Sequence, residues 1–184
     1  LCLNGKEYAS NGTNKIQVKN SGHLVLCDCK GTGVIKGATS GWGGMGIYIY
    51  TGTVDIFGGK FTGGKVTGKG GGGAIALEDS SSTLNIYGGE MRGNNGNGKG
   101  GAIYTKSGGT INMYGGRIAQ NEAYRGGGLC LTDGSTFNMY GGLLENNSST
   151  ANWDTIPANS GNLYIADKAV MNANAGVVRG GGYA

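Results

Sequence analysis

A short alternation of apolar and polar residues recurs along the chain, and each copy runs into a pair of glycines. "VDIFGG" begins at residue 54, and "LNIYGG", "INMYGG" and "FNMYGG" begin at residues 84, 111 and 137. The copies therefore start 30, 27 and 26 residues apart. Alternation with a period of two is typical of a β-strand, because successive side chains point to opposite faces. A repeat of this length indicates a solenoid or a propeller.

Each copy predicts three short strands separated by glycine- and asparagine-rich corners. Seven positions past the start of each copy stands an apolar residue: Phe61, Met91, Ile118 and Leu144. A third apolar segment follows a glycine run, as in "GGAIAL" at 72–77 and "GGAIYT" at 100–105. Strands this short bury their apolar side chains only when turns stack on one another. We therefore expect an all-β parallel β-helix with three strands per turn, right-handed like most parallel crossovers. A propeller blade would need about 40 residues and four strands.

One corner of the repeat carries a recurring amide. Ten positions past the start of each copy stand Gly64, Asn94, Asn121 and Asn147. Asparagine tolerates the left-handed backbone region, and stacked amides can hydrogen-bond to one another. These asparagines can therefore occupy a tight corner and form an amide ladder along the coil.

The repeat extends over residues 1–184 as a single domain. Residues 53–150 hold the most regular copies, and 1–52 and 151–184 have the pattern of irregular terminal turns with loops. Including these segments, we expect six to seven turns. Because residue 1 is a leucine, we expect a processed piece of a longer protein. Neither end has an evident polar cap, so end-to-end association through open strand edges is a hypothesis.

Composition narrows the class of protein. The chain has 42 glycines and 1 proline among 184 residues, and the glycines do not fall at every third position, which excludes collagen. A hydrophobic content of 38% is more than a flexible linker needs. The formal net charge of +4 is too weakly basic to indicate a nucleic-acid partner. No apolar run approaches the ~18 residues of a membrane span, so we expect no membrane insertion.

The segments "LCLNGKEY" and "LVLCDCKGTGVIKG" and the repeated "NMYGG" turns resemble a known family. They are similar to the pectin-lyase-like β-helix repeats of large secreted or cell-surface proteins of Gram-positive bacteria. The glycine rhythm also resembles the repeats of outer-membrane autotransporter passengers. The resemblance covers nearly the whole chain. It implies a right-handed parallel β-helix in an exported, surface-associated protein, such as an adhesin or a stalk.

The acidic residues do not form the arrangements that enzymes of this fold use. Glycoside cleavage needs paired carboxylates, or a bound Ca²⁺ with a catalytic base. The 11 acidic residues scatter when the copies are aligned, and Glu78 and Asp79 are the only adjacent pair. The single histidine, His23, has no visible partner. We therefore expect a protein without enzymatic activity or cofactor, with a polysaccharide lyase or hydrolase as the minor alternative.

Two ladders of outward-facing residues could bind a glycan. By alternation, one row holds Asn85, Asn112 and Asn138, and the next row holds Tyr87, Tyr114 and Tyr140. Aromatic rings and amides suit sugars, which combine an apolar face with hydroxyl groups. Stacking of like on like also stabilises a parallel solenoid in its own right. A glycan site and a purely structural role both stay open.

A third ladder is cationic. Lys69, Lys99 and Arg125 each precede a glycine run. They could bind an anionic polymer, such as teichoic acid or an acidic mucin glycan. Alternatively, basic residues keep a strand edge soluble and block stray pairing.

The cysteines are Cys2, Cys27, Cys29 and Cys130. Cys27 and Cys29 lack the C-x-x-C spacing of zinc and redox sites, and no histidine cluster accompanies them, so we expect no metal site. A disulfide from Cys2 to Cys27 or Cys29 is one reading, and free, partly buried thiols are the other.

Together these features favour a non-enzymatic extracellular β-solenoid with a structural or adhesive role at a cell surface. Its expected partners are glycans, other surface polymers or a second copy stacked end to end. The alternative is a carbohydrate-binding module that uses the tyrosine and asparagine ladders.

Overall fold

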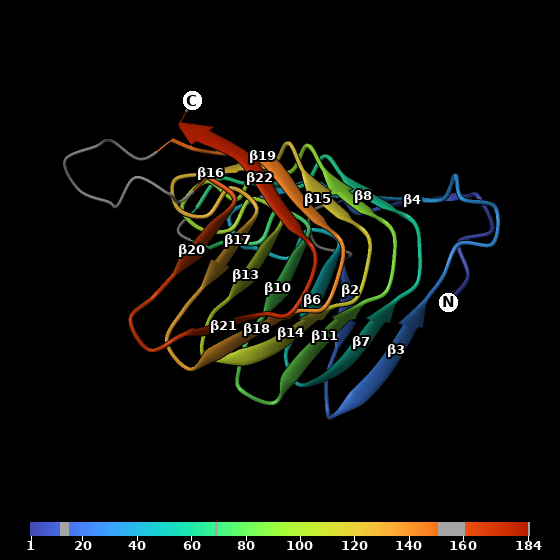
Figure 1. Ribbon diagram of the computed structural model, residues 1–184. Coiled ribbons are helices and arrows are strands. Elements are labelled where there is room, and N and C mark those ends of the chain that lie inside the picture. The colour runs from blue at the N-terminus through green and yellow to red at the C-terminus, as the bar shows by residue number, and fades with distance from the viewer. Residues whose placement is uncertain (12–14, 69, 151–160, 184) are drawn as a thin grey trace.

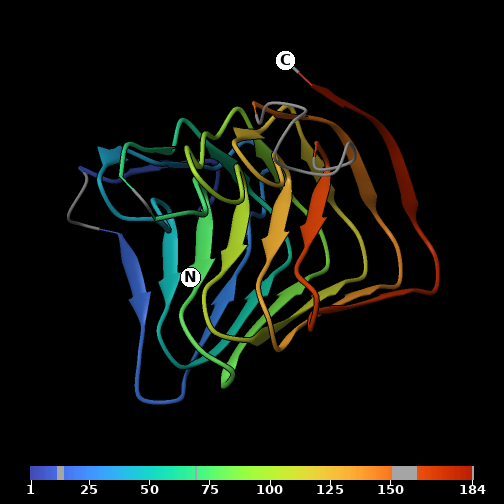
Figure 2. The same cartoon turned by 90° about the vertical axis from the view of Figure 1, so that its left-hand side faces the viewer.

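The computed structural model describes residues 1–11, 15–68, 70–150 and 161–183, and the regular structure in this part of the chain is β-strand throughout. Successive turns stack in parallel into a β-solenoid of about 5 turns (Figures 1 and 2). The predicted fold class is confirmed. The turns are fewer than the six to seven expected, because residues 1–18 and 170–183 each supply strands to only two of the three main sheets and so form incomplete turns. Among the described residues no helix could span a membrane.

Three parallel sheets form the sides of the coil. Sheet I contains β1 (Glu7–Ala9), β4 (Val34–Lys36), β8 (Lys60–Thr62), β12 (Glu90–Arg92), β15 (Arg117–Ala119), β19 (Leu143–Ser149), β16 (Glu122–Ala123) and β22 (Val177–Tyr183). Sheet II contains β2 (Ile16–Val18), β6 (Ile47–Ile49), β10 (Ile75–Leu77), β13 (Ile103–Thr105), β17 (Leu129–Leu131) and β20 (Leu163–Ile165). Sheet III contains β3 (Gly22–Leu26), β7 (Gly52–Ile56), β11 (Ser82–Ile86), β14 (Gly109–Met113), β18 (Ser135–Met139) and β21 (Val170–Ala173). A short pair, β5 (Thr39–Ser40) and β9 (Lys65–Val66), extends one corner.

The predicted register of the apolar positions is confirmed. On sheet III the pairing aligns the first apolar residue of each copy with its counterpart: Val54, Leu84, Ile111 and Phe137. All four side chains are fully buried inside the coil. The polar residues between the buried positions face outward and are only partly buried. Each strand therefore gives one set of residues to the core and the alternate set to the surface.

An amide ladder runs inside the coil at the predicted corner. Asn94, Asn121 and Asn147 are buried, and each donates its backbone N–H and one side-chain N–H to Oδ1 of the next asparagine in the ladder, at 2.9–3.2 Å. The remaining side-chain N–H groups donate to backbone carbonyls such as that of Met91. The ladder thereby gives buried backbone groups at this corner their hydrogen-bond partners.

These asparagines do not use the left-handed conformation that their residue type tolerates. The positive φ angles fall one residue earlier, at Gly93 (65°), Gln120 (55°) and Asn146 (51°). The corner bends at this preceding residue, so the asparagine itself points inward with ordinary backbone geometry. The last step of the ladder was also not predicted, because Asn162 from a different part of the turn supplies the amide that binds Asn147.

Candidate functional site

The outward asparagines of sheet III form the predicted row, and they bond to one another. Asn85 donates from Nδ2 to Asp55, and Asn112, Asn138 and Asn172 continue the chain with N···O distances of 2.7–2.8 Å. His23 closes the Asp55 end, with its Nε2 at 2.7 Å from Oδ2 of the carboxylate. Asn85, Asn112 and Asn138 each donate one N–H along the row and accept one, so the row itself uses half of the hydrogen-bonding capacity of each amide.

In the tyrosine ladder beside this row, the aromatic rings stack directly on one another. Phe57, Tyr87, Tyr114 and Tyr140 stack with centroids 4.6–4.9 Å apart and rings within 10° of parallel. Each inner ring face is therefore covered by its neighbour, and solvent reaches ring edges and hydroxyl groups. The predicted residues do come together, but the geometry favours the structural interpretation, because a sugar ring needs an open aromatic face to stack on.

Sheet II carries a different outward row, in which large and small side chains alternate. The strand register aligns Tyr48 with Ala76, Tyr104, Cys130 and Tyr164 in successive turns. Figure 2 shows the strands that carry this row side by side. Tyrosines two strands apart are separated by about 10 Å, twice the usual strand spacing. Each small residue thus leaves the place of one ring empty in an otherwise aromatic row.

The first of these gaps is an open cleft, which we call the first slot. Its volume is about 410 Å³, and Tyr48, Ala76 and Tyr104 line it together with glycine backbone. Trp42, one of the most exposed large apolar side chains described, stands at its rim, and Lys106 lies at its other side. The slot combines flat apolar walls with a few polar groups, which is the usual make-up of a small-ligand site.

Glycine at one corner position keeps the first slot open. Backbone bridges align Gly71 with Lys99, and Lys99 with Arg125. The predicted cationic ladder therefore holds Gly71, not Lys69, at the position next to Lys99, and Lys69 lies outside the described residues. Lys99 and Arg125 fold over the rings of Tyr104 and Tyr164, at 5.5 and 5.4 Å from the ring centroids. At Gly71 there is no side chain to cover the ring row in this way.

The second gap, above Cys130, is the second slot, and it is strongly basic. Its volume is about 460 Å³, and three cations, Lys99, Lys106 and Arg125, line it with one carboxylate, that of Asp133. Two buried side-chain atoms here, Nε of Arg125 and Oγ1 of Thr132, have no hydrogen-bond partner among the described residues. An unpartnered buried donor is costly, and a bound anion would satisfy it.

Tyr104 and Cys130 contribute no charge to the site. Burial raises the pKa of Tyr104 to about 12 and that of the Cys130 thiol to about 12, so both side chains are neutral at physiological pH. Glu78 accepts hydrogen bonds from Tyr48 and Lys106, which holds both side chains at the wall of the first slot. Since Lys106 lines both slots, one ligand can contact the two together.

Sequence reasoning overlooked this site, although a signal was present. The central residues of the third-strand segments are tyrosine, alanine, tyrosine, cysteine and tyrosine in order. An outward row that alternates large and small residues predicts gaps, whereas a uniform row predicts a filled ladder.

Comparisons with protein-family models, with curated proteins and with solved structures give no match for this chain. Its function is therefore argued from the geometry of its own residues.

Proposed function

We propose that this chain is a non-enzymatic, adhesive β-solenoid of an exported surface protein, and that it binds an anionic carbohydrate on the outer face of sheet II. One sugar ring occupies the first slot between Tyr48 and Tyr104. Its acidic group, or that of the next residue, contacts Lys99, Lys106 and Arg125. The sequence resemblance implies a bacterial surface protein, and we include that assignment in the proposal.

The observation that carries the proposal is the missing ring above Ala76. On sheet III stacked rings lie 4.6–4.9 Å apart, so the gap between Tyr48 and Tyr104 has the width for one further ring. The neighbouring slot supplies cations and an unpartnered Arg125 Nε. A sugar acid has both a ring with an apolar face and a carboxylate, which these two slots would recognise separately. None of the described residues that line the first slot carries a carboxylate, and glycoside hydrolysis needs a pair.

The variant Ala76→Tyr tests the first slot by filling it. We expect the new ring to stack between Tyr48 and Tyr104, so the protein keeps its stability while it loses its ligand. Removing the main contact of a pocket costs about 2 kcal/mol or more, or roughly thirtyfold in Kd. Isothermal titration calorimetry with a uronic acid oligosaccharide measures the change, and thermal unfolding verifies the fold.

Two comparisons make this experiment decisive. Tyr114→Ala, which opens the sheet III ladder, should leave the affinity unchanged, and the carboxyl-reduced neutral oligosaccharide should bind more weakly than the acidic one. Equal binding by wild type and a correctly folded Ala76→Tyr variant would contradict the slot. Shortening of the oligosaccharide during incubation would contradict the non-enzymatic assignment.

The end-to-end association expected from the sequence stays a separate proposal. In its favour, Val170, Val177 and Val178 in the last turn are each 48% exposed. A second copy stacked in register would cover these side chains and pair the open strand edge. Sedimentation velocity should then show mass rising with concentration, and Val177→Lys should restore the monomer. A single monomeric species at high concentration would rule the association out.

A further inference from the structure

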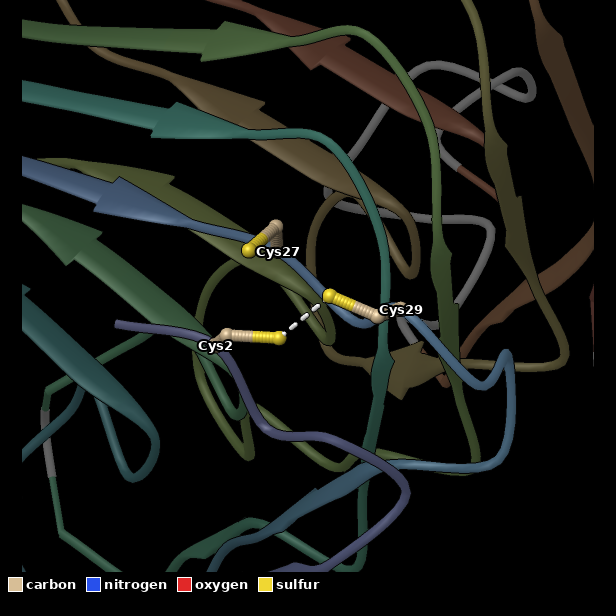
Figure 3. A group of neighbouring side chains, drawn as sticks. All are labelled: Cys2, Cys27 and Cys29. Atoms are coloured by element: carbon tan, nitrogen blue, oxygen red, sulfur yellow. Dashed lines mark hydrogen bonds between the residues drawn. The ribbon is translucent and has the colours of Figure 1, made fainter.

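Three cysteines meet on the outside of the first turn, away from the sheet II slots. Cys2 and Cys27 are direct neighbours in a parallel backbone bridge, and Cys29 follows two residues later. The three sulfur atoms lie within 4.8 Å of one another, and those of Cys2 and Cys29 are 2.7 Å apart. Figure 3 shows these two sulfurs facing each other with Cys27 alongside. No disulfide joins the three in this structure, and the two alternatives from the sequence, a disulfide and free thiols, both stay open.

A carboxylate holds the two cysteine-bearing segments together. Asp28 stands between Cys27 and Cys29, and its Oδ1 accepts the backbone N–H of Gly5 at 2.7 Å. Its Oδ2 accepts the backbone N–H of Gly33 at 2.6 Å. These bonds tie the loop after Cys2 to the loop after Cys29. The cysteine-bearing loops are thereby held in place before any ligand arrives, as metal ligands commonly are by their hydrogen-bond partners.

We propose that Cys2, Cys27 and Cys29 bind a single thiophilic metal ion, of the class of Zn²⁺ or Cu⁺, through three thiolates. Thiolate ligands select these ions over Mg²⁺ or Ca²⁺. Sulfurs at about 2.3 Å from a common tetrahedral zinc lie roughly 3.8 Å apart. All three sulfurs are within 4.8 Å of one another, and the 2.7 Å pair of Cys2 and Cys29 has to open by about 1 Å to bind the ion. The cluster is partly exposed, so water can complete the shell of zinc. A disulfide would use two of the sulfurs and give the third no role. The spacing of Cys27 and Cys29 alone concealed the site, because the third ligand comes from the neighbouring turn.

The full chain, reduced and desalted without oxygen, is titrated with Co²⁺ as a spectroscopic reporter. Thiolate-to-cobalt charge transfer should appear and saturate at one ion per chain. Zn²⁺ or Cu⁺ should displace the cobalt, and the two competition experiments determine which ion binds more tightly.

Cys27→Ser should weaken metal binding by at least about tenfold, since even loss of a hydrogen-bond partner of a metal ligand costs that much. Cys130→Ala, which removes the thiol outside the cluster, should leave the metal affinity unchanged. Binding should also weaken as pH falls, because protons compete for the thiolates.

Three results would overturn the site. The first is unchanged metal affinity in Cys27→Ser, and the second is loss of affinity in Cys130→Ala. The third is a Cys2–Cys29 disulfide in the protein as isolated, found by mass spectrometry after alkylation. If Cys27→Ser folds poorly, alkylation of the wild-type protein with and without Zn²⁺ still tests whether three thiols bind the metal. Bound Zn²⁺ should protect three thiols, and protection of fewer contradicts the proposal.

Discussion

Replacing Asn121 by alanine is expected to lower the free energy of unfolding by about 3–5 kcal/mol. Asn121 is fully buried, and its Oδ1 accepts both the backbone and side-chain N–H of Asn94. Its Nδ2 donates to Asn147 and to the carbonyl of Met91. Alanine leaves the buried N–H of Asn94 and the carbonyl of Met91 without these partners, at about 1–3 kcal/mol for each group, in addition to a small cavity.

The same substitution on the outside of the same turn is the matched control. Asn112 also lies in an amide row, where it donates to Asn85 at 2.8 Å and accepts from Asn138 at 2.7 Å. That row is only partly buried, so water can replace the lost partners, and Asn112→Ala should cost no more than about 1 kcal/mol. Urea denaturation followed by circular dichroism compares the two variants. Equal losses would mean that the inner ladder adds nothing beyond ordinary side-chain hydrogen bonding.

The sheet III rows and the inner ladder could be predicted because spacing alone determines them. From Val54 onward, a strict alternation runs into a glycine pair with no insertion before the next apolar position, so aligning the copies also aligns the strands. One detail of the corner escaped prediction. Gly93 and Gln120 occupy the left-handed position in successive turns, and glutamine is not a residue that marks it in a sequence.

The two candidate sites escaped prediction for different reasons. The glycine run before the third strand has a variable length, so its first residue is an unreliable reference point. Aligning the basic residues that precede each glycine run pairs Lys69 with Lys99, whereas the backbone bridge pairs Gly71 with Lys99. The thiol cluster joins Cys2 to cysteines one turn later, and only the stacking of those turns brings the sulfurs together. Both sites depend on which residues lie above one another, which local spacing does not reveal.

Substitution of Gly100 by alanine is expected to cost more than about 4 kcal/mol and to prevent folding at elevated temperature. Gly100 has a φ of +57°, and a Cβ there would lie 2.1 Å from the carbonyl oxygen of Ile103. The residue cannot move aside, because its N–H donates to the carbonyl of Arg125 and its carbonyl accepts from Gly72. Thermal unfolding of the purified variant, or its recovery in inclusion bodies, measures the effect.

Two other glycines separate the causes of that loss. Gly31 has a φ of +70° with no atom within 4 Å of its would-be Cβ, so Gly31→Ala should cost only the left-handed backbone penalty of about 1–2 kcal/mol. Gly98, two residues before Gly100, lacks a positive φ, and its Cβ would meet nothing nearer than 3.8 Å. Gly98→Ala should therefore change stability by no more than about 0.5 kcal/mol. If Gly100→Ala were no worse than Gly31→Ala, the close approach of Gly100 to the carbonyl oxygen of Ile103 would not constrain this corner, and the positive φ alone would account for the glycine.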